Sequence, residues 1–155
     1  MNYKSNNILI TGGAGYIGSH IAENLIKKKS KVIVLDNLVT GYKKLINKKS
    51  IFIKDDIKNT ARVNKILNKF NIDTIIHLAA YLNVSEAEKY RTKYYNNNVI
   101  NTLKLIKACK NSKVRNIIYS SSCSIYGNVS GFVNENTKPN PIGYYAFTKY
   151  KAEKI

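Results

Sequence analysis

Short apolar runs alternate along the chain with longer segments in which apolar residues recur every three or four positions. Such uninterrupted runs, rich in Ile and Val, are typical of parallel strands buried on both faces of a sheet. The pattern therefore predicts five buried strands, at residues 7–11, 31–35, 50–54, 73–78 and 115–120.

The segments between these runs predict helices at residues 16–28, 60–70, 98–110 and 145–155. In the second of these, Val63, Ile66, Leu67 and Phe70 fall on one helical face. Strands that alternate with helices imply right-handed crossovers, so the fold class is α/β, a doubly wound parallel sheet of the Rossmann type. No Gly or Pro stops the last helix, which therefore reads as unfinished.

The strongly basic composition changes this picture little. The chain has 155 residues, enough for one domain, and its net charge is +17. Nucleic-acid recognition usually relies on Arg, whereas Arg62, Arg91 and Arg115 are the only arginines among evenly scattered lysines. We therefore expect no nucleic-acid partner.

Other features of the composition exclude several further classes. No apolar run is long enough to cross a bilayer, and the N-terminus lacks the pattern of a signal peptide, so we expect no membrane partner and a cytoplasmic location. Cys109 and Cys123 have no metal-ligand spacing. We expect no metal site.

A glycine-rich segment follows the first predicted strand. Residues 12–18 read GGAGYIG, between a strand and a helix, which is the context that a dinucleotide-binding loop requires. Asp36 closes the second strand, where a carboxylate accepts hydrogen bonds from ribose hydroxyls and repels a 2′-phosphate. The predicted cofactor is therefore NAD. The alternative is a structural glycine turn with a solvated Asp36.

A second candidate site lies near the C-terminus. Tyr145 and Lys149 are four residues apart, on one face of the predicted helix. An ammonium one turn away stabilises a phenolate, which makes Tyr145 a candidate proton shuttle. Tyr144 is a rival phenol without that spacing. Ser122 ends a serine run after the fifth strand, and it is either catalytic or a polar loop residue.

Seven short motifs occur along the chain in this order: TGGAGYIG, DNL, DDI, HLAA, YYNNNV, SSSCSIYG and YAFTK. The ordered set resembles the extended short-chain dehydrogenase/reductase family. Within that family the likeness is to the NAD-dependent nucleotide-sugar epimerases that act at C4 of UDP-glucose.

The resemblance implies roles for individual residues. It assigns catalysis to Ser122, Tyr145 and Lys149. It assigns cofactor binding to Gly12, Gly15, Tyr16, Ile17, Gly18, Asp36, Asn37, Asp56, Ile57, Leu78, Ala79, Ala80, Asn97, Tyr145 and Lys149. His20 and His77 are expected to be structural.

The reaction that the resemblance implies interconverts UDP-glucose and UDP-galactose through a transient 4-keto sugar. Tyr145 would take the proton of the 4-hydroxyl while C4 gives hydride to NAD, and Ser122 would hydrogen-bond the same oxygen. Related dehydratases tend to carry an Asp-Glu pair after the serine. Cys123 and Ser124 stand there instead, which favours an epimerase.

Members of that family are roughly twice as long, in keeping with a dinucleotide domain followed by a substrate domain. Residues 1–155 are thus expected to form an incomplete NAD-binding domain, without the final strands and the C-terminal substrate domain. The full-length form would be a homodimer. Two alternatives stay open: an inactive, truncated NAD-binding module, and a related nucleotide-sugar dehydratase or reductase. Leu82 stands where many such epimerases carry a lysine, so the exact subfamily stays open. The sugar stays open as well, because its selection is expected to depend on the C-terminal region.

Overall fold

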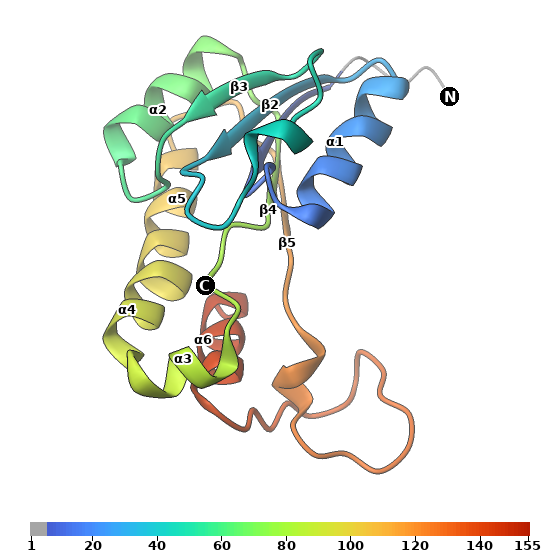
Figure 1. The fold of residues 1–155 in the computed structure, drawn as a ribbon, viewed down its shortest axis with the longest axis vertical. Coiled ribbons are helices and arrows are strands. Elements are labelled where there is room, and N and C mark those ends of the chain that lie inside the picture. Colours follow the sequence, from blue (N-terminus) through green and yellow to red (C-terminus); the bar gives the residue numbers. More distant parts are fainter. Residues whose placement is uncertain (1–5) are drawn as a thin grey trace. The chain divides into compact units, whose positions relative to one another are not determined.

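Five parallel strands form one sheet in a computed structural model of the protein, which describes residues 6–155 (Figure 1). The strands are β1 (Asn7–Thr11), β2 (Lys31–Asp36), β3 (Ile51–Lys54), β4 (Thr74–His77) and β5 (Asn116–Tyr119). Their spatial order is β3-β2-β1-β4-β5, so the strand order reverses between β1 and β4. This is the doubly wound arrangement, and the prediction of the fold class is confirmed.

The chain divides into two compact units. Unit 1 comprises residues up to Ala79 together with Lys104–Ser120, and it contains the sheet. Unit 2 comprises Ala80–Leu103 and Ser121–Ile155. The sequence predicts one incomplete NAD-binding domain over residues 1–155, and this stays a prediction.

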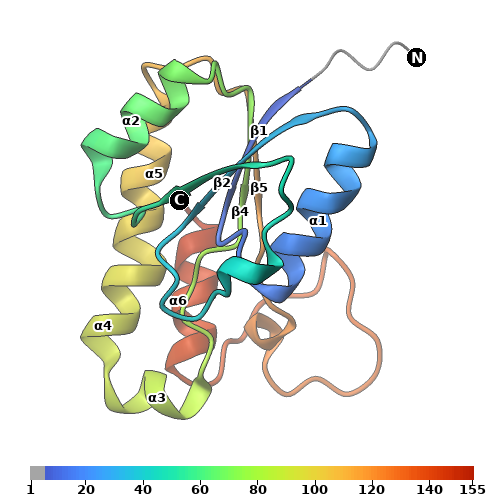
Figure 2. The ribbon, with the colours of Figure 1, turned by 45° about the horizontal axis from the view of Figure 1, so that its top comes forward.

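Helices cover both faces of the sheet in unit 1. Helix α1 (Tyr16–Lys27) lies on one face, and α2 (Thr60–Lys69) lies on the other with the C-terminal part of α5 (Asn101–Cys109) (Figure 2). Adjacent residues of β1 pack on opposite faces of the sheet. Ile8 and Ile10 pack towards α1, whereas Leu9 packs towards α2 and α5. The strand period of two therefore builds two cores from one apolar run.

The two cores account for the apolar runs of β1, β2 and β4, against which the partly buried β3 packs. Ile117 and Ile118 of β5 are exposed, so the prediction that the fifth strand is buried is wrong, because β5 lies at the edge of the sheet. The core under α1 contains Ile8, Ile10, Ala22, Val32, Val34 and Ile76. The core under α2 and α5 contains Leu9, Ile33, Leu35, Ile57, Val63, Ile66, Leu67, Ile72, Ile75, Leu105 and Ala108. The predicted inward face of α2 is confirmed, and Asn59 caps this helix by accepting a hydrogen bond from the backbone N–H of Arg62 at 3.2 Å.

Unit 2 is mainly helical. It contains α3 (Val84–Lys89), α4 (Arg91–Tyr95), the π-helical turn η2 (Asn96–Ile100), the first residues of α5, the 3₁₀ turn η3 (Cys123–Tyr126) and α6 (Tyr144–Glu153). Helix α6 packs against α3, α4, η2 and η3. The sequence pattern did not predict α3 and α4, since each has fewer than two full turns.

Helices α1 and α2 each end one residue before the predicted boundary, and the other two predicted helices differ more. The helix expected at residues 98–110 is a π-helical turn followed by α5, which ends at Cys109. The helix expected at 145–155 begins one residue earlier and ends at Glu153, with Lys154 as its C-cap. Gly143, with a φ of 83°, turns the chain into this helix. No helix in residues 6–155 is long and apolar enough to span a bilayer.

Candidate active site

The glycine-rich segment forms a tight turn between β1 and α1 in unit 1. Gly12 has a φ of 75°, and its N–H donates to the carbonyl of Leu35 at 2.9 Å. A Cβ on Gly12 would lie 2.7 Å from the backbone N of Ala79, which follows β4. This position therefore has room only for glycine, and the turn lies where the strand order reverses.

The start of α1 is open to a ligand. A Cβ on Gly18 would lie 2.5 Å from the carbonyl oxygen of Gly12, so the helix packs directly against the turn. Gly15 is the N-cap, and among the described residues no side chain caps this helix. The first N–H groups of α1, from Tyr16, Ile17 and Gly18, are thus available to an anion at the positive end of the helix dipole.

The carboxylate of Asp36, at the end of β2, is hydrogen-bonded both to the glycine turn and to the loop that follows β2. Its side chain is buried, and its two oxygens accept hydrogen bonds from the backbone N–H groups of Ala14 at 3.0 Å and Leu38 at 2.8 Å. A Cβ on Gly41 would lie 2.9 Å from the same carboxylate. The anion is therefore fixed beside the glycine turn, and each oxygen retains a lone pair for a further donor.

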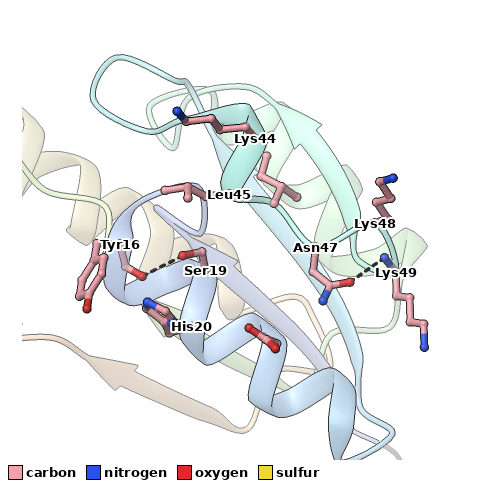
Figure 3. A pocket seen from close by; sticks show the side chains of 10 residues that line it. Tyr16, Ser19, His20, Lys44, Leu45, Asn47, Lys48 and Lys49 are labelled. Carbon is pink, nitrogen blue, oxygen red and sulfur yellow. Dashed lines mark hydrogen bonds between the residues drawn. The ribbon is translucent and has the colours of Figure 1, made fainter.

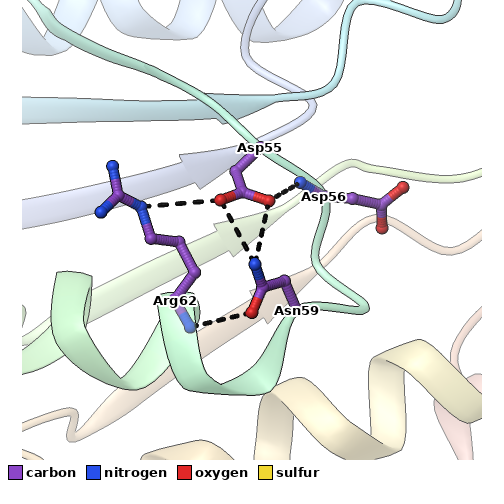
Figure 4. A network of polar contacts seen from close by, with 4 residues as sticks. All are labelled: Asp55, Asp56, Asn59 and Arg62. Atoms are coloured by element: carbon purple, nitrogen blue, oxygen red, sulfur yellow. Dashed lines mark hydrogen bonds and ion pairs between the residues drawn. The ribbon is translucent and has the colours of Figure 1, made fainter.

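Asn37 and Asp56 lie at the ends of neighbouring strands and bind each other. The Asn37 amide donates to an Asp56 carboxylate oxygen at 3.0 Å. Figure 4 shows that Asp55 points the other way, into a network with Asn59 and Arg62. Arg62 Nε lies 3.5 Å from the Asp55 carboxylate. Asp55 thus stabilises the start of α2, and Asp56 is the carboxylate beside Asn37.

In the remaining predicted cofactor residues of unit 1, mainly main-chain groups are left to contact a ligand. The Ile57 side chain belongs to the core under α2, so only its main chain is left for a ligand. Leu78 and Ala79 follow β4, and the Leu78 N–H donates to the carbonyl of Thr11 at 3.0 Å. His77 is buried, with Nδ1 2.6 Å from the Thr11 hydroxyl, in line with the structural role expected for it.

A cavity of about 590 Å³ opens between α1 and the segment 44–49 (Figure 3). Tyr16 is the one predicted site residue that lines it. The Tyr16 ring lies edge-on to His20, with ring centroids 4.7 Å apart. Lys48 and Lys49 point outwards in this view. The side chain of Tyr16 therefore contributes to this cavity.

In unit 2, α6 carries Tyr145 and Lys149 one turn apart, as predicted. The Lys149 side chain is only 3% exposed. Burial lowers the pKa of its ammonium to about 8, and the nearby Glu153 carboxylate opposes that change. A pKa lowered this far towards neutral pH is unusual for a structural lysine and typical of a functional one.

Ser122 is the N-cap of η3, which packs against α6 within unit 2. Its hydroxyl lies 2.8 Å from that of Ser124 and accepts a hydrogen bond from the Ser124 N–H at 3.2 Å. The neighbouring Ser121 hydroxyl donates to Glu153, at the end of α6, at 2.6 Å. The serine run thus contacts the helix that carries Tyr145 and Lys149.

The two adjacent tyrosines of α6 have different surroundings. The Tyr144 ring lies under the Arg91 guanidinium, 5.2 Å from ring centroid to Cζ, and 5.4 Å from the Phe147 ring. Tyr144 therefore belongs to a structural cluster. This arrangement leaves Tyr145 as the phenol on the Lys149 side of the helix.

Asn98 is a residue that sequence reasoning missed. Its buried amide accepts a hydrogen bond from the Tyr81 N–H at 2.9 Å, and donates to the Tyr81 carbonyl and to the Thr148 hydroxyl at 3.1 and 3.2 Å. It also accepts from the amide of Asn97, a predicted cofactor residue, at 3.0 Å. Ala80, another predicted cofactor residue, directly precedes Tyr81 in the chain. The only sequence signal was a polar residue in an otherwise amphipathic helix.

Residues 8–155 match the model of the NAD dependent epimerase/dehydratase family. A UDP-glucose 4-epimerase of Lactobacillus helveticus is 42% identical over 149 residues, which are 96% of this chain and 45% of that protein.

Solved structures of UDP-glucose 4-epimerases are similar to this chain in both sequence and fold. The crystal structure of UDP-glucose 4-epimerase from Brucella ovis in complex with NAD is 39% identical, with a TM-score of 0.92 over 96% of this chain and 46% of that one. The Thermotoga maritima UDP-glucose 4-epimerase with UDP-glucose is 34% identical, with a TM-score of 0.90 over 96% of this chain and 49% of that one. The chain thus spans about half the length of these relatives.

Proposed function

Because the chain belongs to the NAD dependent epimerase/dehydratase family, we propose that it forms the NAD-binding and proton-transfer part of a UDP-sugar C4-epimerase. The reaction is the interconversion of UDP-glucose and UDP-galactose. The observation that carries the proposal is the buried Lys149 ammonium one turn from Tyr145, on a helix that packs against the turn begun by Ser122. A structural lysine would rarely be kept in such a place.

The residues of unit 1 fit NAD. The glycine turn leaves no room for a Cβ at Gly12 or Gly18, and the uncapped N–H groups of α1 suit a pyrophosphate. Asp36 would accept from the ribose hydroxyls and would repel the 2′-phosphate of NADP. Asn37 would contact the same ribose, and Asp56 with the backbone of Ile57 would meet the edge of the adenine.

When bound, NAD supplies a reversible hydride acceptor. Tyr145, as a phenolate, would take the proton from the sugar 4-hydroxyl and later return it, so that no net oxidation occurs. Lys149 would favour the phenolate through its positive charge, which is worth most in a site with little water. Ser122 would donate a hydrogen bond to the same sugar oxygen and stabilise the charge that develops on it.

The residues beside Ser122 favour epimerisation over the family's dehydratase chemistry. Cys123 and Ser124 begin η3 and carry no carboxylate. Elimination of water needs an acid and a base at this position. A dehydratase or reductase is therefore the weaker proposal.

The proposal also covers the UDP group of the substrate, the oligomeric state and the compartment. The UDP group of the substrate would be bound by residues equivalent to the half of the relatives that this chain does not match. The enzyme would act as a homodimer, and light scattering tests this. Cys109 and Cys123 are both free thiols, which suits a cytoplasmic protein.

The test is turnover of UDP-galactose to UDP-glucose by the purified chain, together with analysis of co-purified NAD. Tyr145→Phe should lower the rate about 10²- to 10⁴-fold and reduce bound NAD far less, because the glycine turn and Asp36 remain. Tyr144→Phe is the matched control and should retain activity. A Tyr145→Phe variant with undiminished turnover would refute the catalytic assignment.

A second candidate is a non-catalytic NAD-binding module. It would need only the glycine turn and the Asp36 carboxylate, both of which lie in unit 1. Bound NAD without turnover in the wild-type chain would select this candidate. Absence of bound NAD, with no binding on addition, would remove both.

A further inference from the structure

The N-terminus of α6 receives its cap from another helix. Gly143, the N-cap residue, has no side chain to offer, and the first intrahelical hydrogen bond runs from Phe147 to the Gly143 carbonyl. The backbone N–H of Tyr144 instead donates to the Glu88 carboxylate, on α3, which is 56 residues away in sequence. Glu88 thus satisfies a donor that would otherwise lack an intrahelical acceptor.

The geometry around Gly143 brings this carboxylate close. Gly143 has a φ of 83°, and a Cβ there would lie 3.3 Å from Glu88 Oε1. A side chain at this position would be strained and would press on the capping oxygen. The chain before α6 is therefore shaped to let the carboxylate of another helix reach the first turn.

Arg91 fixes the carboxylate in place. Its guanidinium lies 2.8 Å from the other Glu88 oxygen and over the Tyr144 ring, so one cation contacts both members of the cap. The Tyr144 N–H and then Arg91 lower the pKa of the Glu88 carboxyl. A negative charge at the first turn also suits the helix dipole.

We propose that Glu88, oriented by Arg91, is a positioning residue that caps α6 and thereby holds Tyr145 and Lys149 in place. The inference rests on the proposed function for the roles of that pair, and on the structure for the cap. Glu88 itself would touch neither substrate nor cofactor. The pair occupies the first and second turns of α6, directly after the capped N–H.

The experiment compares Glu88→Met, which removes the acceptor, with Glu88→Gln, which keeps an acceptor oxygen. Glu135→Met is the matched control, since Glu135 is an exposed glutamate in unit 2. Amide hydrogen exchange is measured at Tyr144, Phe147 and Lys149. Glu88→Met should reduce protection there about 2- to 30-fold, the range expected for a lost cap, and Glu88→Gln should recover much of it.

A second readout follows Lys149 directly. The Lys149 amine is titrated by NMR with ¹³C-labelled lysine, and its signal is assigned with Lys149→Gln. Loosening of α6 lets water reach the amine, so Glu88→Met should raise its titration midpoint from near 8 towards 10.5. A change confined to overall stability would leave this midpoint unaltered. Arg91→Met should act in the same direction and more weakly, and it serves if Glu88→Met does not fold.

Unchanged exchange and an unchanged Lys149 midpoint in Glu88→Met would overturn the proposal, as would equal effects from Glu135→Met. Failure of the proposed function has a different signature. The wild-type chain would then show no turnover and no bound NAD, while the effects of Glu88→Met on exchange and on Lys149 would persist.

Discussion

Lys149 is a charged residue that the fold holds away from water. Its burial lowers the pKa of the ammonium to about 8, so the folded state carries a desolvation penalty at neutral pH. The pKa is about 10.5 when the residue is exposed in the unfolded chain. A buried amine of this kind is retained where activity needs it, at the expense of stability.

We expect Lys149→Met to stabilise the chain by up to about 3 kcal/mol at pH 7, since the lowered pKa corresponds to a penalty of that order. Below pH 8 the amine is charged in both states, and the penalty is present in full. Between pH 8 and 10.5 the unfolded state binds more protons, so wild-type stability rises with pH and the advantage of the variant shrinks. Urea unfolding at several pH values measures the difference.

Lys151→Met serves as the control for this measurement, because Lys151 is an exposed lysine on the same helix. It should change stability by less than about 0.5 kcal/mol. A Lys149→Met variant that is no more stable than wild type at pH 7 would show that burial of the amine carries no penalty.

Asp36 is the residue on which the choice of cofactor is expected to depend. Asp36→Ala should weaken NAD binding about 10-fold or more, because it removes a carboxylate that would accept ribose hydroxyl groups. It should also reduce discrimination against NADP. Calorimetric titration with both cofactors measures this, and Asp73→Ala, at the opposite end of the sheet, is the control. Equal NAD affinity in wild type and Asp36→Ala would exclude the role.

At the scale of elements, Asn98 connects three segments of unit 2. Its amide bonds the Tyr81 backbone before α3, the neighbouring Asn97 in η2, and Thr148 in α6. The π-helical turn places this side chain inwards, as such turns often do at functional sites. Asn98 thereby fixes α6 at its second turn, next to Lys149.

Asn98→Leu should destabilise the chain by about 2 kcal/mol, since it leaves the partly buried Tyr81 N–H and carbonyl and the buried Thr148 hydroxyl without this partner. Asn96→Leu is the matched control, because Asn96 is exposed in the same turn. Thermal unfolding followed by circular dichroism compares the two. A smaller loss in Asn98→Leu than in Asn96→Leu would contradict the role of the amide.

At the scale of the whole molecule, β5 is an edge strand with apolar side chains on the surface. Ile117 is 38% and Ile118 57% exposed, and in the described part of the chain β5 pairs only with β4. Exposed, unpaired apolar edges favour association between molecules. The purified chain is therefore expected to self-associate as its concentration rises.

Ile118→Lys should reduce this association, since a charge on an edge strand opposes edge-to-edge pairing. Light scattering across a range of concentrations measures it. Val39→Lys, at an exposed apolar position outside the sheet, is the control and should have little effect. Association that is equal in wild type and Ile118→Lys would place the contact elsewhere.

The sequence alone determined the sheet, its strands and the helices α1, α2 and α6, with boundaries accurate to one or two residues. Hydrophobic periodicity over 4 to 12 residues is a local signal, and β1, β2, β4, α1 and α2 bury the apolar face that this signal records. The glycine turn and the Tyr145–Lys149 spacing are equally local. Candidate residues at both places could therefore be named from the order of amino acids.

Only the tertiary structure decided which helices hold α6 and which side chains surround Tyr144. Helices α3 and α4 are too short for a clear period, and packing in unit 2 stabilises them. The bonds from Glu88 to Tyr144 and from Asn98 to Thr148 join residues 56 and 50 positions apart. Such pairs leave no repeat in the sequence, because the fold alone brings their partners together.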